Sequence, residues 1–100
     1  MTGLQIRLPR LVGTREAADE LVAEAEGTPV DGQAWVLGGA LATSTMSFAD
    51  ELVERLAARG ADQIVIVAGT ERFTQQMSDA ASRHAPVKVR PASADELAQI

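Results

Sequence analysis

A dense group of hydroxyl side chains lies near the middle of the chain, directly before a segment with the pattern of a helix. Its members are Thr43, Ser44, Thr45 and Ser47. Hydroxyl groups can carry a phosphate, cap the first turn of a helix or exchange hydrogen bonds with a bound partner. Two carboxylates, Asp50 and Glu51, follow within about one turn and would offer acid to a basic partner. The segment therefore suggests a helix cap, a phosphorylation site or a recognition surface.

The spacing of Ser47 and Asp50 fits the capping pattern [ST]-x-x-[DE], which predicts that Ser47 is the N-cap of a helix. Such a cap contributes on the order of 1 kcal/mol. A phosphate on Ser47 would add about −1.5 to −2 charges beside Asp50 and Glu51, which would repel it. Thr43, Ser44 and Thr45, farther back in the loop, are better candidates for hydroxyl contacts or modification.

Gly38 and Gly39 open the loop that leads to these hydroxyls. In open α/β sheets, ligands gather beyond the carboxyl ends of the strands, and the N-terminus of a helix attracts anions. The loop matches neither G-x-G-x-x-G nor a P-loop, and no lysine follows it. A nucleotide or phosphorylated small molecule therefore remains an alternative ligand for the 38–47 loop.

Few residues are suited to catalysis or metal binding. The chain has no cysteine, which excludes disulfides, thiolate nucleophiles and zinc–thiolate sites. The single histidine, His84, lies beside Arg83 near the expected end of a helix, where a cation suits the helix dipole. We expect no enzymatic activity, no metal and no cofactor.

Length, charge and hydropathy narrow the class of protein further. With 100 residues, of which 46% are hydrophobic, the chain is expected to form one domain over 1–100, with its core at about 4–90 and a tail at 91–100. A net charge of −5 with only nine Lys and Arg argues against nucleic-acid binding. No apolar run approaches the roughly 20 residues that cross a bilayer, and no signal-peptide pattern is present. A soluble cytoplasmic protein is expected.

Strand and helix patterns alternate along the chain. Strands are expected at 4–9, 33–39, 63–69 and 87–91, and helices at about 14–27, 47–60 and 70–85, with a further helical turn or two after Ser93. Thr14 and Thr70 are the expected N-caps of the first and third helices, Gly60 is expected to end the second, and Ser93 and Glu96 repeat the capping pattern. This β-α-β-α-β-α-β order predicts an α/β fold whose four-stranded sheet is mostly parallel or mixed and is packed by helices. The unbroken apolar run from Ile64 to Val67 is typical of a strand covered on both faces. Trp35, Leu41 and Phe73 are expected in the core.

The motif S-F-A-D-E-L at 47–52, with L-V-G-T-R-E-A-A-D-E-L upstream and Q-I-V-I-V-A-G-T downstream, resembles the STAS-like domain family. That family is similar to bacterial anti-sigma-factor antagonists, and the resemblance covers about residues 4–90. It implies a small α/β fold and a Ser or Thr, near Met46 and Ser47, that a partner kinase phosphorylates to release a regulator. The chain departs from the family pattern at Gly38-Gly39, where Asp-Phe is common, and at Phe48, where a small residue follows the serine.

From these patterns we expect a non-enzymatic, regulatory protein-interaction domain that works through the 38–51 segment. The implied partner is an ATPase-type kinase or an anti-sigma-like regulator. The alternatives are a small-molecule or nucleotide-binding module that uses the 38–47 loop and helix N-terminus, or a self-associating subunit of a bacterial or phage assembly.

Overall fold

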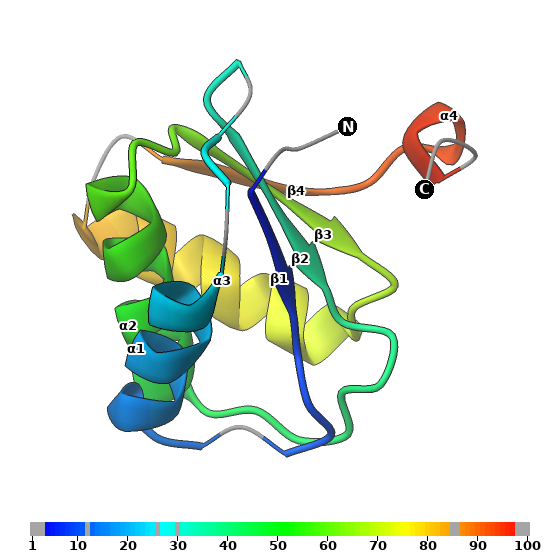
Figure 1. The fold of residues 1–100 in the computed structure, drawn as a ribbon. Helices are drawn as coiled ribbons and strands as arrows, with labels where there is room; N and C mark the ends of the chain where they lie inside the picture. Colours follow the sequence, from blue (N-terminus) through cyan, green and yellow to red (C-terminus); the bar gives the residue numbers. More distant parts are fainter. Residues whose placement is uncertain (1–3, 12, 26, 30, 85–86, 98–100) are drawn as a thin grey trace.

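In a computed structural model, strands and helices alternate along the chain (Figure 1). The structure describes residues 4–11, 13–25, 27–29, 31–84 and 87–97. The elements are β1 (Leu4–Arg7), α1 (Arg15–Glu24), β2 (Gln33–Leu37), α2 (Met46–Ala58), β3 (Gln63–Val67), α3 (Glu71–His84), β4 (Lys88–Pro91) and α4 (Ala94–Leu97). The predicted β-α-β-α-β-α-β order is confirmed, and its C-terminal helical turn is α4.

The four strands form one parallel sheet in the order β1-β2-β3-β4. Each strand pairs with the next along the chain, so every crossover advances in the same direction. Because crossovers of parallel strands are right-handed, crossovers that advance one way place their helices on the same side. Accordingly, α1, α2 and α3 lie together on one side of the sheet, and α4 stands apart near the end of β4 (Figure 1).

The core lies between these three helices and the sheet. On the helical side of the sheet, Leu4 and Ile6 of β1 align with Ala34 and Val36 of β2 and with Ile64 and Ile66 of β3, all buried. Phe48 of α2 and Phe73 of α3 are completely buried, with ring centroids 6.5 Å apart. Leu41, from the loop before α2, is also buried, as predicted.

The opposite face of the sheet, which we call the outer face, is buried at β3 and partly open elsewhere. Its residues are Gln5, Arg7, Gln33, Trp35, Leu37, Gln63, Val65, Val67, Lys88 and Arg90. Val65 and Val67 on this face are 0% and 8% exposed, so the prediction that the Ile64–Val67 run is covered on both faces is confirmed. Trp35 points away from the helices and is only partly buried, so the prediction that it fills the core is wrong. Among the described residues, the helix on this side is α4, which reaches Arg90 through Glu96.

The helix ends confirm several local predictions. The hydroxyl of Thr14 accepts from the Ala17 amide at 3.1 Å, and that of Thr70 accepts from the Phe73 amide at 3.0 Å. Gly60, at φ 99°, follows α2 in the left-handed region that glycine tolerates.

Before α4, Ser93 and Glu96 form a reciprocal capping box. The pairing with Arg90, together with hydrogen bonds from Ser93, lowers the pKa of Glu96 to about 2. Glu96 therefore holds α4 to β4 as a carboxylate at neutral pH.

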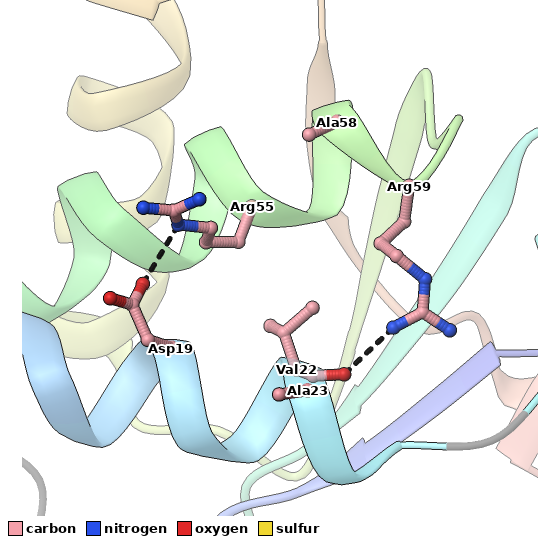
Figure 2. Close-up of a pocket in the computed structure, with 6 residues that line it drawn as sticks. All are labelled: Asp19, Val22, Ala23, Arg55, Ala58 and Arg59. Atoms are coloured by element: carbon pink, nitrogen blue, oxygen red, sulfur yellow. Dashed lines mark hydrogen bonds and ion pairs between the residues drawn. The ribbon is translucent and has the colours of Figure 1, made fainter.

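A groove of about 360 Å³ runs between α1 and α2, and its charged residues tie the two helices together (Figure 2). Arg59 donates to the backbone oxygens of Val22, Ala25 and Gly27 at 2.7, 3.3 and 3.0 Å. The Val22 carbonyl also accepts from the Ala25 amide at 3.2 Å, whereas the Ala25 and Gly27 carbonyls lie past the last turn of α1, where no further helical amide follows. The groove is therefore a packing feature in which the guanidinium caps a neighbouring helix.

No helix within the described ranges has the length and apolar character needed to span a membrane.

Candidate functional site

The loop between β2 and α2 lies at the carboxyl edge of the sheet and is fixed on both sides. The Gly38 amide donates to the Val67 carbonyl at 2.8 Å, and a Cβ on Gly38 would lie 3.1 Å from the Gly69 Cα. Glycine therefore lets the two strand ends approach closely. Gly39, next in the chain, is exposed. On the other side, the amides of Ala42 and Thr43 donate to the Arg10 carbonyl at 2.8 and 3.3 Å.

The N-cap of α2 is Thr45, not Ser47, and the prediction for Ser47 is wrong. The Thr45 hydroxyl accepts from the Phe48 amide at 3.2 Å and donates to the Gly13 carbonyl at 3.0 Å. Ser47 lies inside the first turn and is exposed. The Thr45 hydroxyl therefore caps α2 and also joins it to Gly13, just before α1, and we attribute the position of the cap to this second contact.

Replacing Thr45 with alanine is expected to lower the free energy of unfolding by about 1 kcal/mol, within the 0.5–2 kcal/mol range of lost N-caps. The matched change Ser47→Ala should leave stability within about 0.5 kcal/mol, because the side chain is exposed and alanine suits a helix. Urea denaturation followed by circular dichroism measures both. A larger loss from Ser47→Ala than from Thr45→Ala would show that the capping assignment is incorrect.

Ser44 is also engaged within the molecule. Its hydroxyl donates to Oε1 of Gln76 on α3 at 2.5 Å, and Nε2 of Gln76 donates to the Ser44 carbonyl at 3.5 Å. These contacts dock the loop on α3. Of the predicted loop hydroxyls, Ser44 and Thr45 therefore have structural partners, whereas Thr43 and Ser47 are exposed.

Thr43 stands beside a small polar pocket at the carboxyl edge. The pocket, of about 130 Å³, is lined by Leu41, Ala42, Thr43, Ser44, Thr70 and Arg72. Thr43 also forms a parallel β-bridge with Leu11, whose side chain is 68% exposed. The fold thus brings the exposed Thr43 and Thr70, the guanidinium of Arg72 and the exposed side chain of Leu11 to the same edge.

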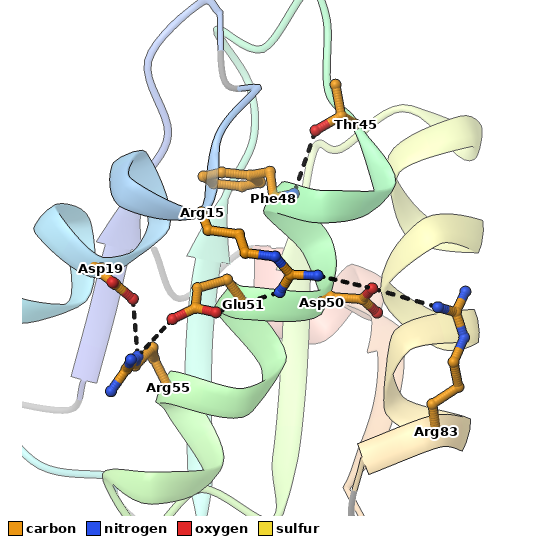
Figure 3. Close-up of polar contacts among 8 residues, drawn as sticks. All are labelled: Arg15, Asp19, Thr45, Phe48, Asp50, Glu51, Arg55 and Arg83. Carbon is orange, nitrogen blue, oxygen red and sulfur yellow. Dashed lines mark hydrogen bonds and ion pairs between the residues drawn. The ribbon is translucent and has the colours of Figure 1, made fainter.

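Asp50 and Glu51 do not face outward, so the prediction that they attract a basic partner is wrong. Their side chains are only 12% and 9% exposed. Asp50 Oδ2 lies 3.3 Å from Nη1 of Arg83 and 3.8 Å from Nη2 of Arg15 (Figure 3). The carboxylate bridges α1 and α3 from its place on α2.

Glu51 joins α1 to α2 in the same network (Figure 3). Its carboxylate receives Arg15 Nη1 at 3.3 Å and Arg55 Nε at 2.7 Å, and Arg55 also reaches Asp19 at 2.8 Å. Hydrogen bonding between the carboxyls of Asp19 and Glu51 lowers the pKa of Glu51 and raises that of Asp19, and Arg55 and Arg15 lower the Glu51 value further. Glu51 is thus held ionised as a structural charge.

Sequence reasoning missed the partners of these carboxylates. The spacing of Glu51 and Arg55, i and i+4 on one helix, is a local signal that indicates an ion pair. No such signal joins Asp50 to Arg83, which is 33 residues away. The side chain of His84 lies outside the described residues; its backbone ends α3.

The described carboxylates form no group of three or more that could hold a metal ion. Compared with family models, curated proteins and solved structures, the chain finds no match among any of the three.

Proposed function

We propose that this chain is a regulatory protein-binding module without catalytic activity. It recognises a protein partner through a carboxyl-edge surface, which consists of Leu11, Thr43, Thr70 and Arg72. The observation that carries the proposal is the exposure of Leu11, the large hydrophobic side chain that remains most open to solvent among the described residues. An exposed aliphatic side chain on a bridged, hydrogen-bonded segment presents an ordered apolar contact to a partner.

Backbone strain at the same edge supports this placement. Ala68, in the turn between β3 and α3, has a φ of 58°, a conformation that residues with a side chain rarely adopt. Strained backbone persists only where the surrounding structure holds it, and it clusters at functional sites. Ala68 and Thr43 belong to the two loops that meet through Gly38 and Gly69.

The resemblance to STAS-like domains supports a phospho-switch on this surface. Thr43 is the hydroxyl best placed for it, because the residue is exposed and shares its pocket with Arg72. A phosphate adds about −1.5 to −2 charges and pairs favourably with a guanidinium. The partner would then be an ATPase-type kinase, or an anti-sigma-like regulator that the phosphate releases.

Phosphorylation is tested by incubating the protein with ATP and an extract of its source cells, followed by intact-mass measurement and peptide mapping. We expect a single phosphoryl group on the wild-type chain and on Ser47→Ala, and none on Thr43→Val. Phosphate on Thr43→Val at the wild-type level would reject Thr43 as the acceptor, and an unmodified wild-type chain would reject the switch.

Partner binding is tested separately, with a photo-reactive benzoylphenylalanine at position 11 or, as a control, at position 24. Glu24 is exposed at the C-terminal end of α1, which runs from the carboxyl edge of the sheet back toward the amino edge, where β2 begins. After irradiation in an extract of the source cells, we expect a cross-link to a partner protein of one defined mass from position 11 and none from position 24. Equal products from both positions would contradict recognition at this surface.

The size of the pocket argues against the nucleotide alternative. Ligand pockets commonly hold about 300–1,000 Å³, whereas the pocket beside Thr43 holds about 130 Å³. It fits a phosphoryl group better than a whole nucleotide. Saturating nucleotide at 100 times its dissociation constant would add about 2.7 kcal/mol of stability, so thermal shift against a nucleotide panel distinguishes the two.

A further inference from the structure

The outer face of the sheet is an independent surface that the carboxyl-edge proposal does not use. All-parallel sheets occur almost only with both faces covered. Here α1, α2 and α3 cover one face, and on the other the described chain contributes α4 beside β4 (Figure 1). Val65 and Val67 of β3 face away from the main core but are themselves buried. Apart from Gln63, the outer-face residues that keep surface open to solvent therefore lie on the other three strands.

The middle of the outer face is apolar. Trp35 lies between Gln5 and Val65 in register, and Leu37 lies between Arg7 and Val67. Trp35 and Leu37 are partly buried, so each keeps some surface open to solvent. A groove of about 330 Å³, lined in part by Arg7, Leu37 and Val67, continues the face at its carboxyl end. The shape and composition suit apolar side chains from outside.

The charge of this face is opposite to that of the protein as a whole. The chain carries a net charge of −5, yet its strands place only cations on the outer face: Arg7, Lys88 and Arg90. Arg90 is paired with Glu96 of α4. Arg7 and Lys88 are exposed, and neither forms an ion pair within the described chain.

The pairing of α4 shows what kind of group this face accepts. Glu96 contacts Arg90 with both carboxylate oxygens, at 2.5 and 2.6 Å, from a short helix that also carries Asp95. An acidic helical segment of the chain thus already forms an ion pair with one of the three cations, Arg90. A second copy of the whole outer face would instead bring Arg7 and Lys88 toward like charges.

From this complementarity we propose that the outer face binds an acidic, amphipathic helical segment of a partner protein. Apolar side chains of the segment cover Trp35 and Leu37, and its carboxylates pair with Arg7 and Lys88. These cations stand at opposite corners, four residues along the strands and three strand spacings across. Standard spacings separate them by about 20 Å, which corresponds to about 13–14 residues of α-helix.

That distance defines a probe peptide. The probe is a helix of about 18 residues with a leucine stripe and two glutamates about 14 residues apart on that stripe. Two matched peptides carry glutamine or lysine in place of the glutamates. None contains tryptophan, so Trp35, the single tryptophan of the protein, reports on binding from within the proposed surface.

Titration of the full chain with the glutamate peptide is expected to give a saturable blue shift of Trp35 emission. The glutamate peptide should bind at least about ten-fold more tightly than the glutamine peptide, and added salt should weaken it because the exposed charges are screened. The double variant Arg7→Glu, Lys88→Glu should prefer the lysine peptide. The control Arg10→Glu, an exposed cation between β1 and α1 that belongs to neither the outer face nor the carboxyl-edge surface, should bind like wild type.

Four results would overturn the proposal. The first two are no emission change with the glutamate peptide and equal binding of the glutamate and lysine peptides. The third is a Trp35 shift caused by anionic phosphatidylglycerol vesicles alone. The fourth is a Trp35 shift that depends on protein concentration in parallel with dimerisation, as measured by light scattering. Circular dichroism of each variant checks that its secondary structure matches that of the wild type. The outcome is independent of cross-linking at position 11.

Discussion

Replacing Phe48 with alanine is expected to lower the free energy of unfolding by about 3–5 kcal/mol, the usual cost of removing a buried aromatic ring. Phe48 lies in the first turn of α2, is completely buried and packs against Phe73, which is also completely buried. The cavity would open where α2, α3 and the sheet meet. For a domain whose total stability is typically 5–15 kcal/mol, such a loss approaches unfolding.

Urea denaturation followed by far-ultraviolet circular dichroism measures this effect. Two variants serve as controls. Phe48→Leu keeps much of the volume and should cost distinctly less than Phe48→Ala. Leu11→Ala removes an aliphatic side chain that is 68% exposed and should change stability by no more than about 0.5 kcal/mol. A loss below about 1 kcal/mol for Phe48→Ala would contradict the assignment of this ring to the core.

The second large effect is expected from Glu51→Gln, which keeps the side-chain volume and removes the charge. Breaking one partner of a buried ion pair costs about 3–5 kcal/mol. The cost here should be smaller, about 1.5–3 kcal/mol, because Arg15 and Arg55 are each 50% exposed and water can solvate them. The control is Glu54→Gln, the same change on the same helix at an exposed position, for which we expect no more than about 0.5 kcal/mol.

The pH dependence gives this prediction a second measurement. The pKa of Glu51 is lower in the folded state than its ordinary value of 4.5. Its stabilisation is therefore fully present above about pH 4.5 and is lost as the pH falls through the folded value. The raised pKa of Asp19 acts in the opposite direction, since a carboxyl with a raised pKa favours the folded state at low pH.

The stability difference between wild type and Glu51→Gln should consequently be constant near neutral pH and shrink as the pH falls below about 4.5. Denaturation of both proteins between neutral pH and pH 3 checks this. A difference that stays the same at pH 3, or one that grows, would show that Glu51 acts through packing rather than through its charge.

The elements and most of the caps could be predicted from the sequence because both depend on neighbours in the chain. Alternating and helical periodicities gave the order of strands and helices. Thr14, Thr70 and the Ser93–Glu96 box were identified because an N-cap bonds to an amide two or three residues away. Local chemistry of this kind is visible in any short window of sequence.

The position of the α2 cap and the role of the acidic pair could not be obtained in this way. Thr45 and Ser47 both offer a hydroxyl, and the choice rests on the Gly13 carbonyl, which is 32 residues from Thr45. Asp50 and Glu51 have the appearance of exposed helix-start acids. Their guanidinium partners come from α1 and α3, so only the assembled helices show that these charges are internal.

By itself, the sequence determined that the chain alternates strands and helices and that hydroxyl residues precede its central helix. Only the tertiary structure decided which hydroxyl is accessible, that the carboxylates are enclosed, and that Trp35 lies outside the core. The physical reason is strand order. Because each strand pairs with the next and the crossovers share one hand, the three main helices lie on a single side, and no pattern within one strand reveals which of its faces they cover.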